Sequence, residues 1–135
     1  MNALSLSTLK ISGIAAIATL GLAAAALPQA LTQGQPISFS MEVQPILEHA
    51  CVECHQPGGE GYKASGLDLR TYASLMKGTK HGPMVIPGDP LTSNLLVLIE
   101  GRASPSIRMP YHMHPLRKEY DSIIRQWIIE GAKDN

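Results

Sequence analysis

Apolar residues recur at intervals of three and four in the stretch that leads to the two cysteines of the chain. These positions are Val43, Ile46, Leu47, Ala50, Cys51 and Cys54. Such spacing is typical of a helix with one buried face. Ser40 can cap its N-terminus, Phe39 can pack against the first turn, and Pro45 is compatible with an early helical position. We therefore expect an amphipathic helix that starts at about Ser40 and carries both cysteines on its buried side.

The pattern beyond this helix predicts further helices separated by loops. We expect a flexible loop over residues 57–66, a short helix over 71–77, a helix over 90–101, an irregular wall or lid over 102–115, and a final helix over 118–130. Clusters of Gly and Pro mark the loops. No segment has the convincing alternation of a β-strand. The chain is therefore predicted to be all-α, with about four helices in its folded part.

The N-terminal region has a different composition from the rest of the chain. Residues 11–27 carry no charge and are rich in Ala, Ile, Leu and Gly, and the stretch before them has one cation, Lys10. This pattern is typical of an export signal, and residues 24–26 offer small side chains for cleavage. The apolar run can also be extended to Leu31, which reaches the lower length needed to span a bilayer.

A cleaved signal peptide and an uncleaved membrane anchor would both export the chain from about Thr32 onward. We expect residues 1–31 to form this export segment, residues 32–38 to form a polar linker, and residues 39–135 to form the folded domain. The domain would lie on the periplasmic side of a bacterial membrane. It would be soluble after cleavage, or anchored through residues 11–31.

Both cysteines belong to one short motif, Cys51-Val52-Glu53-Cys54-His55. The C-x-x-C-H pattern is the attachment signature of c-type haem. Each thiol can add across a haem vinyl group, and the adjacent histidine can present a neutral imidazole nitrogen to the iron. We therefore expect one haem c, bound covalently through Cys51 and Cys54 and ligated by His55.

Two other chemistries can use paired cysteines. A thioredoxin-like dithiol would lie at a helix N-terminus in a βαβ unit, whereas this motif closes a predicted helix. A structural zinc site needs four ligands, and the fourth would have to come from a distant histidine. Export to an oxidising compartment also fits covalent haem, because no further cysteine is present to form other disulfides.

Charge and aromatic content agree with a haem protein. The chain has 11 basic and 11 acidic residues, and its formal net charge is zero. No basic stripe or aromatic platform indicates nucleic-acid binding. One Phe and one Trp are few for the core of a 135-residue chain. A buried porphyrin would supply the large apolar body that these aromatic side chains do not.

The residues after the linker resemble the monohaem cytochromes c, and more closely the planctomycete-type cytochrome c domains. The segments that carry the resemblance are Val43-Gln44-Pro45-Ile46-Leu47, Cys51-Val52-Glu53-Cys54-His55, Gly66-Leu67-Asp68-Leu69, Val85-Ile86-Pro87-Gly88-Asp89-Pro90, Ser93-Asn94-Leu95-Leu96, Arg108-Met109-Pro110 and Trp127-Ile128-Ile129-Glu130-Gly131-Ala132. The resemblance implies a small class I cytochrome c-like fold around a covalent haem. It also implies that the first and last helices cross beside the haem, and that Met109 is the distal iron ligand.

Physical reasoning also favours Met109, because a distal thioether needs a rigid, non-helical support and Pro110 fixes the backbone beside it. Met113 in the same loop and Met84 in the loop 79–87 are alternatives. His81, His112 and His114 are possible nitrogen ligands, and an open iron position is a further option. The predicted metal ligands are therefore His55 and Met109, with these alternatives open.

Several cations lie near the predicted site in the sequence. Arg102 and Arg108 could pair with the haem propionates. Arg117 and Lys118 depart from the family pattern, because two cations replace a Ser or Thr cap at the start of the last helix. We interpret them as solvated charges at a frayed helix end, with a docking patch for an acidic partner as the alternative.

The motif and the resemblance predict an electron-transfer protein and no enzyme activity. The expected partners are redox proteins or a membrane electron-transfer complex, met through the exposed haem edge. If the N-terminal segment is retained, the chain would act as a subunit that relays electrons within a larger respiratory or photosynthetic complex. A haem enzyme or gas sensor is the remaining alternative, and it requires an open iron site.

Overall fold

A computed structural model describes residues 34–135 of the chain. The predicted signal peptide or membrane anchor, residues 1–31, lies outside the described residues, as do positions 32 and 33 of the predicted linker. No helix within residues 34–135 is both long enough and apolar enough to cross a bilayer.

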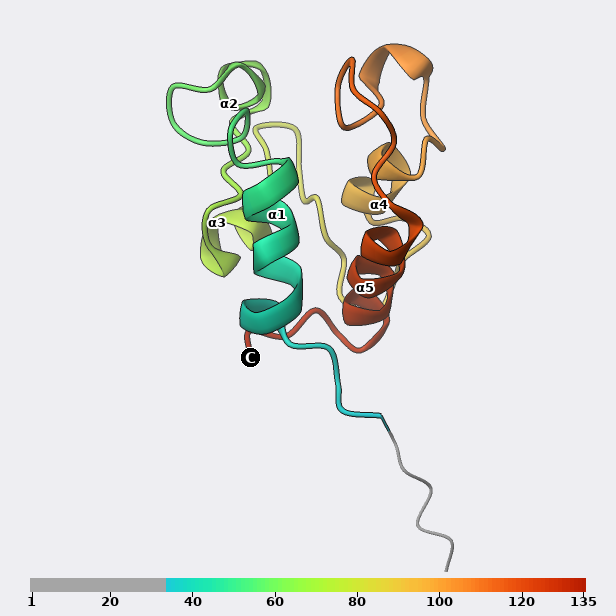
Figure 1. Cartoon of the computed structure of the whole chain (residues 1–135). Helices are drawn as coiled ribbons and strands as arrows, with labels where there is room; N and C mark the ends of the chain where they lie inside the picture. Colours follow the sequence, from blue (N-terminus) through green and yellow to red (C-terminus); the bar gives the residue numbers. More distant parts are fainter. Residues whose placement is uncertain (1–33) are drawn as a thin grey trace, which may run out of the picture. The chain divides into compact units, whose positions relative to one another are not determined.

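Helices form the regular structure of the described residues (Figure 1). They are the π-helix η1 (Phe39–Val43), α1 (Gln44–Ala50), α2 (Glu60–Ser65), α3 (Tyr72–Lys77), α4 (Asn94–Ile99), the 3-10 helix η2 (Pro105–Ile107) and α5 (Lys118–Ile129). Within residues 34–135 the extended pairing is limited to an isolated bridge between Thr79 and Gly82. The predicted all-α class is therefore confirmed, and this part of the chain has five α-helices where about four were expected.

The cap of the first helix is Ser38, two residues before the predicted cap. The Ser38 hydroxyl accepts a hydrogen bond from the Met41 amide at 3.2 Å, and the Glu42 carboxylate accepts one from the Ser38 amide at 2.8 Å. This reciprocal arrangement satisfies two amides at the helix N-terminus. Ser40 was predicted as the cap, but its hydroxyl donates to the Asn135 carbonyl at 2.9 Å. η1 then continues directly into α1, which ends at Ala50. The prediction that this helix carries both cysteines on its buried side was therefore wrong: the cysteines follow the helix, and Cys54 is exposed.

Helix α2 lies where a flexible loop was predicted. Its six residues include Gly61, and Gly66 ends it with a positive φ of 77°. The Ser65 hydroxyl donates to the Gly61 carbonyl at 2.7 Å, and Lys63 forms an ion pair with Glu60 at 2.7 Å. The prediction was wrong because the glycines of this stretch indicated flexibility, whereas α2 packs against the cysteine motif.

Helix α4 begins at Asn94, four residues after the predicted start at Pro90. The reason is a turn closed by Asp89, whose carboxylate accepts from the amides of Leu91 and Thr92 at 3.0 and 3.1 Å. Ser93 is fully buried. Its hydroxyl donates to the Asp89 carbonyl at 2.7 Å and accepts from the Ile86 amide at 2.9 Å. These bonds satisfy the turn without a helix.

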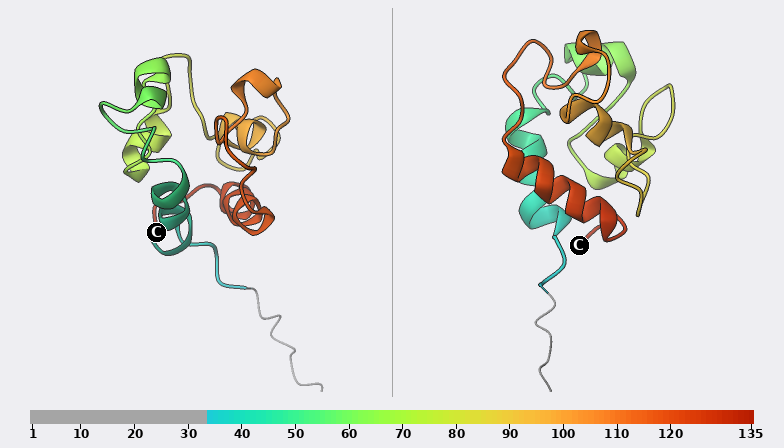
Figure 2. Two further views of the ribbon diagram at one scale, coloured as in Figure 1. Left: turned by 45° about the horizontal axis from the view of Figure 1, so that its top comes forward. Right: turned by 90° about the vertical axis from the view of Figure 1, so that its right-hand side faces the viewer.

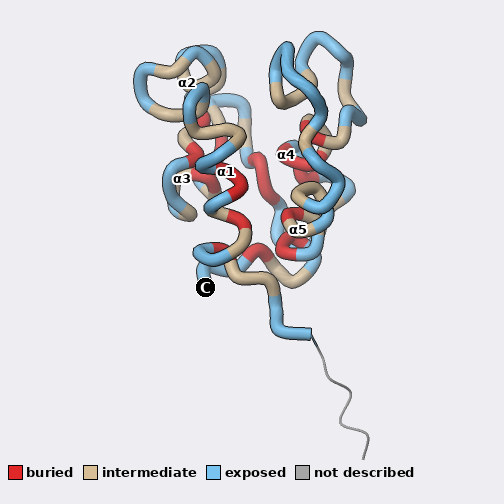
Figure 3. Tube along the Cα trace, in the orientation of Figure 1, coloured by how far each residue is buried: buried red, intermediate tan, exposed pale blue. Residues whose placement is uncertain are grey.

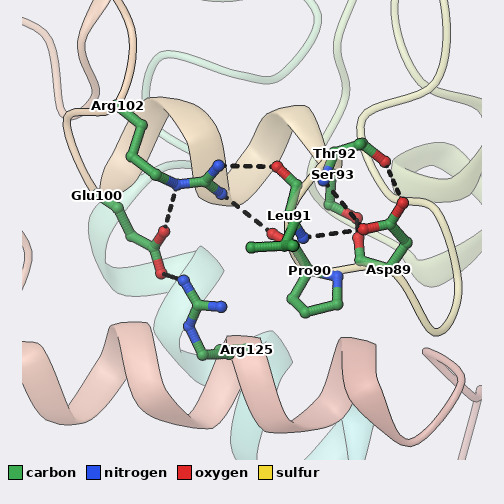
Figure 4. Close-up of polar contacts among 8 residues, drawn as sticks. All are labelled: Asp89, Pro90, Leu91, Thr92, Ser93, Glu100, Arg102 and Arg125. Carbon is green, nitrogen blue, oxygen red and sulfur yellow. Dashed lines mark hydrogen bonds and ion pairs between the residues drawn. The ribbon is translucent and has the colours of Figure 1, made fainter.

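Arg102 fixes the same turn to the end of α4 (Figure 4). Its guanidinium donates to the carbonyls of Leu91 and Pro90 at 2.7 and 3.0 Å, and to the Glu100 carboxylate at 2.7 Å. The other oxygen of Glu100 accepts from Arg125 of α5. Glu100 therefore joins the turn, α4 and α5 in one charged network.

The core is closed by aromatic side chains from both ends of the domain. Phe39 lies 5.4 Å from Trp127 and 5.2 Å from Tyr72, measured between ring centroids. The Trp127 indole donates to the Lys133 carbonyl at 2.9 Å, and the Tyr72 hydroxyl donates to the Ala132 carbonyl at 2.9 Å. η1 consequently packs against α5, and Figure 3 shows buried residues along α1, α4 and α5 and between α3 and α4.

The start and the end of the described chain are bonded to each other. The Ile37 amide donates to the Glu130 carboxylate at 2.7 Å, and the Phe39 amide donates to the Asn135 side chain at 2.9 Å. Both views in Figure 2 show the C-terminus beside the start of the first helix. The end of α1, with the cysteine motif, therefore lies at the opposite end of that helix from the closed aromatic core.

Asp121 supplies a test of this packing. One of its carboxylate oxygens is buried without a hydrogen-bond partner. Burial and the neighbouring charge of Glu100 raise the pKa of Asp121 above its ordinary value of 3.8, while Arg125 acts in the opposite direction. The stability that the protonated carboxyl contributes is present below pH 3.8 and is lost as pH rises through the higher folded-state pKa. Asp121→Asn should therefore raise the free energy of unfolding near neutral pH, by about 0.5 kcal/mol.

The measurement is denaturant unfolding at neutral pH and again below pH 3.8, where the gain from Asp121→Asn should disappear. Asp68→Asn is the matched control. The hydrogen bond from Arg70 lowers the pKa of Asp68, so that substitution should lose stability near neutral pH instead. A gain from Asp121→Asn that is equal at both pH values would contradict the assignment.

Candidate haem site

The cysteine motif forms a tight turn at the end of α1. The Cys51 amide still donates to the Leu47 carbonyl at 2.9 Å, which closes the helix. The Cys51 carbonyl then accepts from the amides of Cys54 and His55 at 3.2 and 3.0 Å. Because this turn is compact, both thiols and the imidazole originate from a single rigid stretch of backbone.

Two later segments hold this turn in place. The Tyr62 amide of α2 donates to the Cys54 carbonyl at 3.0 Å, and the Leu69 amide donates to the His55 carbonyl at 2.9 Å. Leu67 and Leu69 are themselves buried in the core. The motif is thus fixed from both sides by backbone hydrogen bonds rather than by its own helix alone.

Gly59 and Gly61 allow α2 to lie directly against the motif. A β-carbon at Gly59 would overlap the carbonyl oxygen of Cys54, and one at Gly61 would lie 2.7 Å from Cε1 of His55. Neither distance is compatible with a side chain unless the neighbouring atoms move. Sequence reasoning missed these two residues as parts of the site. The sequence did contain one indication of their role, because both glycines follow His55 within six residues.

Both cysteines, His55 and Met109 line one cavity of about 820 Å³. Its walls are largely apolar and are formed by Leu67, Leu69, Met84, Leu95, Leu98, Ile99, Ile107 and Leu116. The two thiols are free rather than joined in a disulfide. The end of α1, helix α2, helix α4 and the irregular segment after η2 all contribute to this cavity, so residues far apart in the sequence meet there.

Met109 is attached to the wall of the cavity that α4 forms. Its amide donates to the Leu98 carbonyl at 3.2 Å. Met84 and Met113 line the same cavity, with exposed fractions of 7% and 69% respectively. All three thioethers that were considered as iron ligands therefore lie around the cavity. The choice of Met109 among them stays a prediction.

The electrostatics of the motif agree with haem attachment. Burial, with a smaller contribution from Cys54, raises the pKa of Cys51 to about 11. A thiol of this kind stays neutral near pH 7, whereas a redox-active dithiol needs a lowered pKa. Within residues 34–135, no three side chains of His, Cys, Asp or Glu are grouped so that they could hold a metal ion by themselves.

His55 has the properties that iron ligation requires. Burial lowers its pKa, which favours the neutral imidazole, while the backbone of Leu67 opposes this shift. Neutral imidazole is the form that binds metals. The Nδ1 atom of His55 is buried and makes no hydrogen bond of normal geometry. The apolar cavity, the two free thiols and this unpartnered ring together fit a covalently bound haem.

The other predicted ligands and cations are dispersed. His81 lines the main cavity, whereas His114 lines an adjoining groove of about 320 Å³ together with His49 and Arg117. This groove shares Cys54 and Met113 with the main cavity. His112 is exposed and lines neither hollow. Arg117 lies over the ring of Tyr120, 4.1 Å from its centroid, and this contact accounts for one of the two cations at the start of α5.

Arg102 and Arg108 do not line the main cavity. Arg102 uses its donors on the turn before α4 and on Glu100 (Figure 4). The side chain of Arg108 lies beside Gly101. The structure therefore does not bring these two arginines to the cavity in which a haem and its propionates would lie.

Comparison with known families agrees with the resemblance in the sequence. Residues 51–110 match the model of the family described as planctomycete cytochrome C. This match confirms the family resemblance over this stretch. The matched segment begins at Cys51 and ends at Pro110, so it contains the whole motif and Met109. No curated protein and no solved structure matches the chain.

The contact between Gly61 and His55 can be tested in the haem-loaded protein. Gly61→Ala should displace the imidazole from its position, because the added β-carbon would lie 2.7 Å from the ring. We expect a shift of the optical spectrum away from that of a six-coordinate, low-spin haem. Gly34→Ala is the matched control, since an added β-carbon there meets nothing within 4 Å. An unchanged spectrum in Gly61→Ala would show that His55 does not need this contact.

Proposed function

We propose that this planctomycete-type cytochrome c domain is a one-electron carrier with a single haem c. The haem would be attached through Cys51 and Cys54 and ligated by His55 and Met109. The observation that carries the proposal is that these four side chains, which come from two distant segments of the sequence, residues 51–55 and residue 109, line one apolar cavity of about 820 Å³. The match of residues 51–110 to a cytochrome c family supports the same function.

Different residues of the cavity would have different roles in such a carrier. A bound haem supplies a reversible one-electron change at its iron. Cys51 and Cys54 keep the cofactor from dissociating. His55 offers a neutral imidazole from one wall, and Met109 offers a thioether from the other. The leucine side chains exclude water, and a dry, apolar site raises the reduction potential relative to an exposed one.

The rim of the cavity supports an encounter with redox partners. Ile107, Tyr111 and Met113 line the cavity and have exposed fractions of 52%, 55% and 69%. Cys54 is also exposed. Exposed apolar residues beside a cofactor suit the small and weak interfaces that electron-transfer proteins form. The partners we propose are redox proteins or a membrane electron-transfer complex on the periplasmic side.

The alternative in which the chain is a membrane-anchored subunit depends on residues 11–31. Intact mass of the mature protein separates the two forms, because a cleaved chain would begin near Leu27 and an anchored one at Met1. The domain would perform the same electron transfer in either form. The anchored form would act as a fixed relay, and the cleaved form would diffuse between partners.

Substitution of Met109 tests the distal ligand. In the haem-loaded protein, Met109→Ala should remove the thioether, change the optical and magnetic spectra, lower the reduction potential and permit rapid binding of carbon monoxide to the ferrous iron. Met113→Ala is the matched control, because Met113 lines the same cavity from an exposed position. Met84→Leu tests the buried alternative with little change in volume.

Rapid carbon monoxide binding by the unsubstituted protein would favour the enzyme or gas-sensor alternative. Unchanged spectra in Met109→Ala would contradict the His55 and Met109 assignment. A spectral change in Met84→Leu or Met113→Ala would then identify the methionine that is the ligand.

A further inference from the structure

A haem brings two propionate carboxylates into the protein, and the cavity has few groups that can pair with them. Charged groups in a partly buried site need an opposite charge or hydrogen-bond donors. Among the described residues, no Arg or Lys lines the main cavity. The lining residues that can carry a positive charge are His55 and His81. His55 faces the predicted iron position, so His81 is the cation available for a carboxylate.

His81 lies in a tight turn that several hydrogen bonds hold in place. The Thr79 amide donates to the Gly82 carbonyl at 2.9 Å, and the Gly82 amide donates back to the Thr79 carbonyl at 3.2 Å. The Thr79 hydroxyl accepts from the His81 amide at 3.0 Å. The Lys80 amide donates to the Ser65 carbonyl at the end of α2, at 3.0 Å. The turn is therefore fixed to the same helix that supports the His55 ring.

The chemistry of attachment sets the direction in which the propionates point. Thioether bonds to Cys51 and Cys54 place the vinyl edge of the haem at the end of α1, and the propionates of haem lie on the opposite edge of the ring. In the right-hand view of Figure 2 the end of α1 lies at the left of the domain, and the yellow segment that contains residues 79–82 lies at the right. A propionate would consequently approach the turn that carries His81.

The polar groups near His81 are also compatible with a propionate at this position. Asn94 lines the cavity and donates through its side chain to the Pro83 carbonyl at 3.3 Å, two residues after His81. The other titratable groups that line the cavity, besides the two cysteines and His55, are Glu60 and Tyr111. Glu60 is paired with Lys63 at 2.7 Å, and Lys80 is the charged neighbour in the turn. Besides His55, His81 is thus the residue of the cavity lining whose side chain can pair with a propionate as a cation.

We propose that His81 pairs with a haem propionate and that its protonation couples the reduction potential of the protein to pH. This inference rests on the proposed function as a haem c carrier. Reduction adds one electron to the site and removes one positive charge. His81 therefore binds a proton from solvent more tightly in the reduced state than in the oxidised state. By the same linkage the reduction potential falls as pH rises through the range in which His81 loses its proton.

The experiment is a potentiometric titration of the haem-loaded full-length protein from about pH 5 to about pH 9, the range in which histidine titrates. We expect the parent protein to show a fall of potential with pH, and His81→Gln to lose this dependence. His49→Gln is the matched control, because His49 is exposed and lines only the adjoining groove on the Cys54 side, not the main cavity. That variant should keep the parent's dependence on pH.

Two results would overturn the inference. One is a pH dependence that persists unchanged in His81→Gln, and the other is a parent protein whose potential does not vary with pH. The optical spectrum separates this failure from failure of the proposed function. If the six-coordinate haem spectrum is intact in every variant, only the role of His81 is contradicted. If the parent protein lacks that spectrum, the electron-carrier assignment itself is contradicted.

Discussion

The His55 ring lies against Gly61 at a separation that leaves no room for a β-carbon. The rest of the site depends on this close approach. Because Gly61 and Gly59 lack side chains, α2 can pack on the motif and donate the Tyr62 amide to the Cys54 carbonyl at 3.0 Å. The end of α2 then holds the turn that carries His81. The close approach of Gly61 to the His55 ring thus positions one wall of the cavity and, through the end of α2, the turn that carries His81.

The opposite wall is positioned by a separate set of interactions. Met109 is bonded to the end of α4 through the Leu98 carbonyl, and Glu100 joins α4 to Arg102 and to Arg125 of α5. α5 in turn packs on η1 through Trp127 and Phe39. Since η1 continues into α1, the two walls are connected through the aromatic core at the closed end of the domain. A cavity for a rigid planar cofactor needs two walls that keep their separation, and this arrangement supplies them.

The sequence predicted those features that depend on local patterns. The helix over 71–77 and the helix that starts at Lys118 follow from periodicity, and the structure has both. The first helix was predicted as well, but it ends at Ala50 and does not carry the cysteines on its buried face. The motif itself predicted Cys51, Cys54 and His55 as neighbours on one turn. Nothing yet tests the assignment of Met109 or the division of the chain at residues 31 and 38, so both stay predictions.

The misses share a physical cause, because each depends on contacts between segments far apart in the sequence. α2 has six residues and no apolar periodicity, and its glycines are needed only because His55 and Cys54 lie against them. Ser38 caps the first helix, and the hydroxyls of both Ser38 and Ser40 donate to the carbonyl of Asn135, almost a hundred residues later. Arg102 was considered as a possible partner of the haem propionates, and its guanidinium donates to the carbonyls of Pro90 and Leu91 instead. The chemical type of a residue does not reveal which distant residue it contacts in the fold.

Mass spectrometry of the denatured protein, produced in a host that matures c-type cytochromes, tests the central claim most directly. The account predicts that the unfolded chain keeps the mass of one haem, and that Cys51→Ser combined with Cys54→Ser abolishes this retention. A native chain that loses its haem on denaturation, or that carries zinc or a Cys51–Cys54 disulfide instead, would contradict it.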